Sequence, residues 1–285
     1  ARSRVPAWLA WLANRPLGLP FVTTVHGFNS VNAYSKVMTY GDRVICVSGA
    51  IKEHVRQHYG IADEKLVVIP RGIDLALFDP QRVDQEFIAS FRRSYGLEGK
   101  FVVSTVGRIT QLKDYETFIS ALTQVKQAIP RLVGLIVGGI HPDRQEYFKR
   151  LQQQVKEARA EDYILFTGSQ AKVAEIYALS NAVVSSSKKP ESFGRAAAEA
   201  LAMNVPVVAT GHGGMLDIVR EGRTGFLFAP GDVQGLSEKL MAVRKHPFED
   251  LRQFVIENFT LEQMVEKTLG VYTSQVLLNK FREED

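Results

Sequence analysis

Two glutamates eight positions apart, Glu191 and Glu199, have the spacing in this 285-residue chain that most directly suggests chemistry. The apolar residues 181–187 before them are typical of a buried strand, and residues 195–203 are rich in helix-forming alanine and leucine. The order is therefore strand, loop, helix. In an open parallel sheet such a junction lies at the carboxyl end of a strand, where ligands bind.

The start of the predicted helix favours anions, because the backbone amides of Phe193, Gly194 and Arg195 have no partner within the helix. A helix terminus contributes about 0.3–1 kcal/mol per exposed charge, which is enough to orient a phosphate. The two carboxylates would repel a phosphate, but they accept hydrogen bonds well from vicinal hydroxyls. This combination favours a ligand that carries both phosphates and sugars, namely a nucleotide-sugar.

Two cations, Arg108 and Lys113, follow the strand-like residues 101–106 and add positive charge near the same edge. Negative charge accumulates on a diphosphate leaving group as its glycosidic bond breaks, so fixed cations stabilise the transition state more than the ground state. Charge pairing on a loop surface is the alternative. His26 ends another predicted strand, and it either contributes to a site or is a structural histidine.

These residues stand among further motifs in an order that resembles the retaining glycosyltransferases of family 4, which have the two-domain GT-B fold. Glu191, Phe193, Gly194 and Glu199 match the Glu-x7-Glu signature of that family. The other matching segments are Gly107-Arg108 with Lys113, residues 204–210, Gly213-Gly214, residues 225–232, residues 24–26, Val47-Ser48 and residues 69–74. The resemblance covers nearly the whole chain but only part of the family's length.

The resemblance implies a role for each matched residue. Glu199 holds the ribose hydroxyls of the donor, Glu191 contacts the donor sugar and stabilises the reacting centre, and His26 faces the donor hexose. Arg108 and Lys113 neutralise the diphosphate. The expected nucleotide-sugar site consists of Gly107, Arg108, Lys113, Ser192, Phe193, Gly194 and Glu199. The family generally needs no catalytic metal or cofactor, and its favoured mechanism is same-face attack in which the leaving phosphate deprotonates the acceptor.

The apolar pattern predicts strands at residues 20–25, 43–47 and 65–69, with helices at 32–39 and 50–58. Six more strands, with helices between them, are expected at residues 101–106, 132–137, 164–167, 182–186, 205–209 and 225–228. The pattern predicts an α/β fold, of GT-B type by the resemblance, in which two Rossmann-like doubly wound parallel-sheet domains face a cleft.

The expected domains are an acceptor-side domain at residues 1–78, a nucleotide-sugar-binding domain at 79–259, and a helix at 260–285 that returns toward the first. Three strands are fewer than a usual Rossmann-like domain has. Because each strand-plus-crossover unit takes about 30 residues, about 90 more residues would be needed to complete the domain. We therefore expect an N-terminally truncated chain whose own activity is open.

The composition, with 45% hydrophobic and 23% charged residues, is ordinary for a soluble globular protein. A net charge of +4 without a basic-aromatic patch does not indicate nucleic-acid binding. The single Cys46 excludes an intrachain disulfide and favours a reducing cytoplasm. Residues 1–13 carry arginines and tryptophans, which either meet an anionic lipid-linked saccharide at the inner face of the cytoplasmic membrane or belong to an ordinary packed helix.

Two positions depart from the family pattern: Asp114 stands where glycine often follows the lysine, and Arg71 stands where asparagine is frequent. His54 and His58 have the spacing of a helical metal pair but lack an evident third ligand, so no metal is expected.

The expected function is transfer of a hexose-type sugar from a nucleotide-sugar to a saccharide or lipid-linked acceptor, with lipopolysaccharide or envelope glycan synthesis as the leading context. A GT-B sugar-nucleotide epimerase or hydrolase and a non-catalytic nucleotide-sugar-binding module are the alternatives. The sequence leaves UDP, GDP and ADP open as donor nucleotides.

Overall fold

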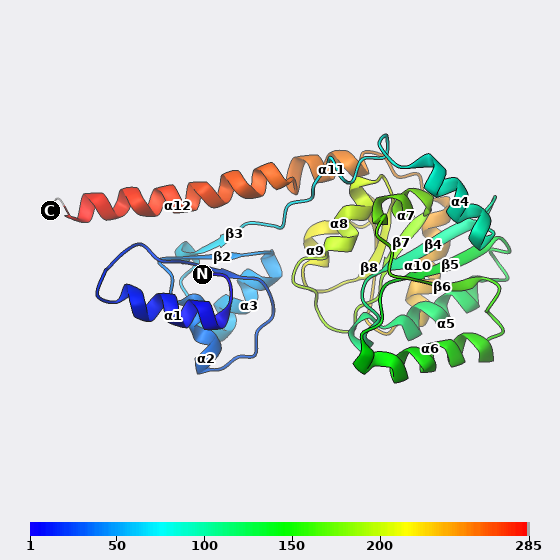
Figure 1. Cartoon of the computed structure of the whole chain (residues 1–285), viewed down its shortest axis with the longest axis horizontal. Coiled ribbons are helices and arrows are strands. Elements are labelled where there is room, and N and C mark those ends of the chain that lie inside the picture. Colours follow the sequence, from blue (N-terminus) through cyan, green and yellow to red (C-terminus); the bar gives the residue numbers. More distant parts are fainter. Residues whose placement is uncertain (284–285) are drawn as a thin grey trace. The chain divides into compact units, whose positions relative to one another are not determined.

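The computed structural model describes the backbone of residues 1–283 and the side chains of residues 1–276 (Figure 1). The chain forms two compact units. Unit 1 contains Ala1–Gly72, Pro190–Phe193 and the residues from Phe259 on, and unit 2 contains Ile73–Lys189 and Gly194–Asn258. The last two residues of the helical segment expected at 260–285 lie outside the described residues.

Unit 2 is built, within the described residues, on a six-stranded parallel sheet with the order β6-β5-β4-β7-β8-β9. Its strands are β4 (Phe101–Val106), β5 (Leu132–Val137), β6 (Ile164–Gly168), β7 (Ala182–Ser185), β8 (Val207–Thr210) and β9 (Gly225–Phe228). The order reverses between β4 and β7, which makes this pair the switch point where doubly wound sheets bind ligands. The predicted α/β class and all six strands are confirmed.

Helices cover both faces of this sheet, as Figure 1 shows for α4 on one side and α5 and α6 on the other. The helices of unit 2 are α4 (Gln85–Tyr95), α5 (Tyr115–Val125), α6 (Gln145–Glu157), α7 (Val173–Leu179), α8 (Arg195–Ala202), α9 (Met215–Ile218), α10 (Val233–Lys245) and α11 (Leu251–Asn258). Consecutive residues of β4 enter opposite cores, because Val102 packs with α4 and α7 whereas Val103 packs with α5. A central strand such as β5 is therefore buried along its whole length, which explains its hydrophobic run.

Unit 1 contains a three-stranded parallel sheet in the order β1-β2-β3, again counted over the described part of the chain. Its elements are α1 (Arg4–Asn14), β1 (Val22–Val25), α2 (Ala33–Lys36), β2 (Arg43–Cys46), α3 (Gly49–Tyr59), β3 (Leu66–Val68) and α12 (Leu261–Glu283). Val44 and Cys46 face a core with α1 and α3, whereas Ile45 packs with Ile69 and with Val271 of α12. Burial raises the pKa of the Cys46 thiol to about 12, so this cysteine is an inert core residue.

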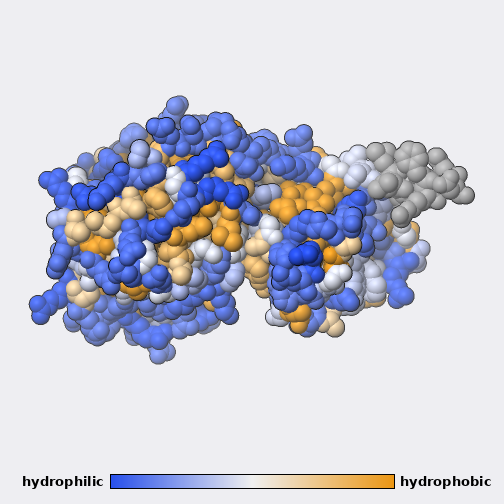
Figure 2. Space-filling view, turned by 180° about the vertical axis from the view of Figure 1, so that it is seen from behind, coloured by the Kyte–Doolittle hydropathy of each residue, from blue (hydrophilic) through white to orange (hydrophobic). Residues whose placement is uncertain are grey.

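Local chemistry sets the ends of several elements. Ser48 caps α3 by accepting a hydrogen bond from the amide of Ile51 at 3.1 Å, and the helix ends at Gly60 with φ 61°. The helix expected at residues 32–39 is instead α2 followed by a 3-10 turn, Val37–Thr39. On the face shown in Figure 2 the surface is mainly hydrophilic, with hydrophobic groups gathered in patches. Among the described helices, none combines the length and apolar character needed to cross a bilayer.

Candidate donor and acceptor sites

The predicted cations of unit 2 lie at the switch point of its sheet. Gly107, Arg108 and Lys113 follow β4, and the segment that begins with Ser186 follows its parallel neighbour β7. Lys113 ends a 3-10 turn, and its side chain lies over Gly107, since a Cβ built on that glycine would be 3.3 Å from Lys113 Cε and 3.7 Å from Nζ. Gly107, with φ 156°, thus leaves room for the ammonium group. Arg108 is exposed at the same edge.

Asp114 connects the two loops that follow β4 and β7. It adopts the left-handed conformation (φ 52°, ψ 54°), which glycine adopts without strain and aspartate tolerates better than most residues. Its buried carboxylate accepts a hydrogen bond from Thr117 Oγ1 at 2.7 Å and pairs with Lys188 Nζ at 3.1 Å. Ser186 Oγ donates to the main-chain oxygens of Lys113 and Asp114. Asp114, which stands where the family often has glycine, therefore accommodates the left-handed conformation, and its side chain adds a tie between the loops.

Glu199 is held in a fixed orientation within unit 2. Its side chain is only 13% exposed. Tyr177 Oη donates to Glu199 Oε2 at 3.2 Å, and Arg195 Nε pairs with Oε1 at 3.0 Å. Burial raises the pKa of the Glu199 carboxyl, while Arg195 and the tyrosine hydrogen bond oppose that shift. Each oxygen keeps a lone pair with which to accept a hydrogen bond from a ligand hydroxyl.

Gly194 begins α8, as the sequence predicts. Its φ of 105° favours glycine, and a Cβ at this position would lie 2.8 Å from Met215 Sδ. A side chain at this position would strain the backbone and push aside the ends of the Met215 and Ile218 side chains. Glycine therefore allows the sharp turn from the loop into the helix. The residue just before this turn, Phe193, belongs to unit 1, where its ring packs edge-on against Phe259 at 5.6 Å between centroids.

His26 of unit 1 lies between two arginines. Arg2 Nε is 3.2 Å from His26 Nε2, and Arg71 Nη2 is 3.2 Å from Nδ1. Burial lowers the pKa of His26 to about 4, and the two guanidinium charges act in the same direction. The imidazole is therefore neutral at physiological pH. A Cβ on the adjacent Gly27 would lie 3.4 Å from Ser192 Oγ, so the structure brings Ser192 beside the loop that carries His26.

The remaining predicted residue, Glu191, is half-buried and belongs to unit 1 together with Ser192 and Phe193. The structure thus places Gly107, Arg108, Lys113, Gly194 and Glu199 in unit 2, and His26, Glu191, Ser192 and Phe193 in unit 1. Within the described residues, no group of three or more His, Cys, Asp or Glu side chains is arranged to hold a metal. His54 stacks against His58 at 4.4 Å between ring centroids and contacts Phe28 edge-on.

Sequence reasoning missed the groups that orient these residues. Tyr177 lies 22 positions from Glu199, and no local pattern connects them. Arg195 is spaced i, i+4 from Glu199, so that ion pair had a readable signal. Arg71 and His26, which are in contact, are 45 positions apart in the chain. The only sign of this contact in the sequence is the arginine at position 71, where the family frequently has asparagine.

The fold is that of the GT-B class of glycosyltransferases, and comparisons with known proteins agree. A model of the family described as "Glycosyl transferases group 1" matches residues 87–260, and one described as "Glycosyltransferase Family 4" matches residues 1–77. The chain belongs to the glycosyltransferase group 1 family.

Two relatives illustrate the similarity. Mannosylfructose-phosphate synthase of Agrobacterium fabrum is 31% identical over 72% of this chain and 45% of its own length. D-inositol 3-phosphate glycosyltransferase of Actinosynnema mirum is 28% identical over 97% of this chain and 72% of its own length. The chain thus spans less than half of the first relative and about three quarters of the second.

Solved structures show the same fold. A glycosyltransferase from Rickettsia africae matches with a TM-score of 0.88 at 28% identity, over 96% of this chain and 76% of that one. Anabaena Alr3699/HepE, solved in complex with UDP, matches with a TM-score of 0.85 at 25% identity, over 95% of this chain and 77% of that one.

Proposed function

We propose that this chain transfers a hexose-type sugar from a nucleotide-sugar to a hydroxylated acceptor with retention of configuration. Glu199 carries the proposal, because Tyr177 and Arg195 hold its largely buried carboxylate in a fixed orientation. It lies on α8, which follows β7, the parallel neighbour of the strand that leads to Arg108 and Lys113. In this scheme Glu199 accepts hydrogen bonds from the ribose hydroxyls, and the two cations neutralise the diphosphate. The proposal assigns Glu191 and His26 to contacts with the donor sugar.

UDP is the proposed donor nucleotide, since a structural relative at 25% identity was solved with UDP. A relative named as a lipopolysaccharide core mannosyltransferase, from Rhizobium leguminosarum, is 27% identical over 73% of this chain and 59% of its own length. Its name supports synthesis of lipopolysaccharide or of another cell-envelope glycan as the context of the transfer. No metal or cofactor is part of the proposal.

Calorimetry with UDP, GDP and ADP tests the nucleotide site. We expect selective binding of UDP and a loss of about 10–100-fold in affinity in Glu199→Gln, because hydrogen bonds to a charged group contribute about 1.5–3 kcal/mol. Folding should be little affected, since glutamine has nearly the same shape and can still meet Tyr177. Glu221→Gln is the matched control. Glu221 lies just before β9 in unit 2 and pairs with Lys239, so the variant removes a paired carboxylate outside the candidate site.

Deoxynucleotides test the ribose assignment itself. If Glu199 binds the ribose hydroxyls, 2′- or 3′-deoxy-UDP loses affinity for the parent chain but suffers little further loss in Glu199→Gln. Equal penalties in both proteins would remove the assignment. Conversion of UDP-sugar without an acceptor would favour an epimerase or hydrolase. Binding of UDP-sugar without any turnover would favour a non-catalytic binding module.

We further propose that α1 contacts an anionic bilayer surface. Its tryptophans point inward: Trp8 Nε1 donates to the main-chain oxygen of Tyr34, and both Trp8 and Trp11 pack beside Tyr40. On the other face Val5, Leu9 and Leu12 are 59%, 64% and 51% exposed. These three side chains form an apolar stripe on α1. Residues 1–41 contain three arginines and one lysine but no aspartate or glutamate, so this segment places no acidic side chain beside the stripe.

Vesicle sedimentation tests this contact. The chain should bind vesicles that contain phosphatidylglycerol, bind phosphatidylcholine vesicles much less, and lose most binding in Leu9→Glu/Leu12→Glu. Leu77→Glu is the control, because Leu77 is equally exposed but lies in unit 2. Unchanged binding in the double variant would contradict the proposal, and a large fall in Tm would mean that the stripe packs internally.

A further inference from the structure

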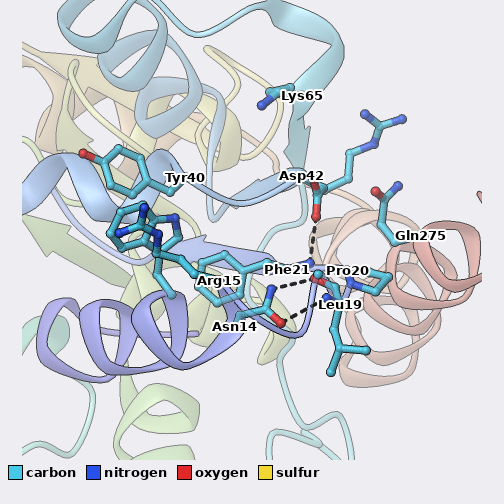
Figure 3. A pocket seen from close by; sticks show the side chains of 12 residues that line it. Asn14, Arg15, Leu19, Pro20, Phe21, Tyr40, Asp42, Lys65 and Gln275 are labelled. Carbon is cyan, nitrogen blue, oxygen red and sulfur yellow. Dashed lines mark hydrogen bonds between the residues drawn. The ribbon is translucent and has the colours of Figure 1, made fainter. Parts of the chain in front are cut away.

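Unit 1 has a cavity of about 660 Å³ at the amino edge of its sheet (Figure 3). The three strands of this sheet are parallel, so their first residues meet at one edge. The cavity is lined there by Phe21, which precedes β1, by Arg43, which begins β2, and by Lys65, which precedes β3. Arg15, directly after α1, and Gln275 of α12 also belong to its wall.

Strand alternation places Arg43 and Gln275 on the same face of the sheet. Val44 packs in the core that contains α1 and α3, so Arg43 and Ile45 on either side of it lie on the opposite face. Ile45 packs there with Val271 of α12, and Gln275 lies about one turn further along that helix. The arginine and the glutamine therefore reach the cavity from neighbouring positions.

The cations of the cavity wall are not neutralised by neighbouring carboxylates. Arg43 lies beside Lys65, since the residues that follow them in β2 and β3 are register partners. Neither side chain forms an ion pair within the described residues, and neither does Arg15, whose guanidinium lies 5.4 Å from the centre of the Trp11 ring. Asp42 is the one acid among the described lining residues. Three positive charges and one negative charge therefore line the cavity.

Hydrogen bonds within unit 1 hold the loop that borders this cavity. Asn14 Nδ2 donates to the main-chain oxygen of Leu19 at 2.6 Å, and Asn14 Oδ1 accepts from the amide of the same leucine at 3.1 Å. Asp42 Oδ2 accepts from the amide of Phe21 at 2.8 Å, and Figure 3 shows these bonds as dashed lines. The wall is therefore largely formed before a ligand enters, which lowers the entropic cost of binding.

Gln275 carries an unsatisfied hydrogen-bond donor in the same wall. Its side chain is 7% exposed, and its Nε2 has no hydrogen-bond partner among the described residues. Figure 3 shows the amide pointing away from α12. A buried donor without an acceptor is unfavourable and is rare in folded proteins. An oxygen of a ligand in the cavity would supply the missing acceptor.

We propose that this cavity binds a phosphate group through the side chains of Arg15, Arg43, Lys65 and Gln275. Arginine presents a planar fork that matches phosphate oxygens, and lysine adds a compact charge. A phosphate ester has three acceptor oxygens and a carboxylate has two, so phosphate suits donors from four separate segments better. The volume is typical of sites for small organic molecules, so the phosphate belongs to a larger ligand.

The phosphate site is separate from the proposed sugar-transfer site. His26 follows β1 and so lies at the opposite edge of the sheet, whereas Lys113 and Glu199 belong to unit 2. The inference therefore does not depend on the proposed function.

The phosphate comes either from a soluble ester or from the headgroup of an anionic phospholipid. Leu19 lines the cavity and is 56% exposed, and Leu17 in the same loop is 64% exposed. A phospholipid would place its acyl chains against these leucines, whereas a small soluble ester would leave them in water. The two sources share the phosphate chemistry and differ in this apolar contact.

Calorimetry and tryptophan fluorescence test the site with two probes, glycerol 3-phosphate and dihexanoyl phosphatidylglycerol below its micelle concentration, and with glycerol as the neutral match. We expect saturable binding of at least one phosphate probe, no binding of glycerol, and a change in the emission of Trp11, which lines the cavity beside Arg15. Trp8→Phe should keep this change and Trp11→Phe should remove it. Similar affinities identify a soluble ester, and at least tenfold tighter binding of the phospholipid identifies a lipid headgroup.

Charge variants make the result specific. Arg43→Gln and Lys65→Gln should each weaken phosphate binding about 10–100-fold, because each removes a charge-assisted hydrogen bond. Arg56→Gln is the matched control, since it removes one positive charge from α3, outside the cavity. Lys65 is exposed and precedes β3, so its variant stays folded even if Arg43→Gln does not. Equal affinity in Lys65→Gln and the parent, or no saturable binding of either phosphate probe, would overturn the proposal.

Gln275→Leu distinguishes a binding role of the amide from a structural one. Leucine removes the unsatisfied donor, so without ligand the variant should have a Tm at least as high as that of the parent. Its phosphate affinity should nevertheless fall. A lower Tm with unchanged phosphate affinity would show that the amide supports the fold and does not bind phosphate. UDP binding should be the same in these variants and in the parent, because the residues proposed to bind the nucleotide belong to unit 2.

Discussion

Replacing Lys113 by methionine is expected to lower sugar transfer from the UDP-sugar donor by about 10³-fold, as is typical when a fixed group that stabilises transition-state charge is removed. The ammonium group lies over Gly107 at the end of β4, beside the sheet's switch point. Methionine keeps the unbranched shape and most of the length of the side chain but carries no charge. Because the charge on the diphosphate grows as the bond to the sugar breaks, turnover should fall more than UDP affinity.

The phosphate dependence of the effect identifies its cause. Uridine has no phosphate, so its affinity should be the same in Lys113→Met and in the parent. Lys149→Met is the control, since Lys149 is an exposed cation on α6 whose removal changes the net charge equally. Equal losses of UDP and uridine affinity would show that Lys113 supports the fold of the loop rather than the diphosphate.

The central strands of unit 2 were predictable because they lie between two helical layers and are buried. β4, β5 and β9 begin and end at the predicted residues. β8 begins at Val207 rather than at residue 205, because Pro206 has no amide to donate to the ladder although its oxygen accepts from Val183. The residue at which a strand begins depends on the strand with which it pairs, and the sequence alone does not say which strands are neighbours.

The residues proposed to bind the donor could be picked out from the sequence because they occur in recognisable motifs, as Lys113 and Glu199 do. Of the groups that hold Glu199, Arg195 lies one helical turn away, but Tyr177 comes from another helix. The pairing of Asp114 with Lys188, 74 positions further along the chain, likewise had no signal in the sequence. Side-chain contacts between distant segments depend on the tertiary fold and leave no periodic signal.

A methyl group at position 138 should disrupt the donor site without altering any ligand-binding side chain. A Cβ on Gly138 would lie 1.8 Å from the main-chain oxygen of Gly107 and 2.8 Å from its carbonyl carbon. Both atoms belong to backbone that is already held, because the Gly107 amide donates to Val137 O at 2.9 Å. Gly138→Ala must therefore push apart the ends of β4 and β5. We expect a loss of about 3 kcal/mol in the free energy of unfolding, at the upper end for overpacking.

The same displacement moves the backbone that leads into Arg108 and Lys113. A misplacement of about 1 Å can cost about 10²-fold in rate, so UDP affinity and turnover should both fall well beyond what partial unfolding explains. Denaturant titration and calorimetry, the latter at a temperature where circular dichroism shows the variant folded, measure the two effects separately. Gly139→Ala is a closely matched control, because a Cβ there meets nothing nearer than Ser169 Cβ at 3.6 Å. If Gly138→Ala binds UDP as tightly as Gly139→Ala, the close approach of the ends of β4 and β5 does not position the loop that carries Arg108 and Lys113.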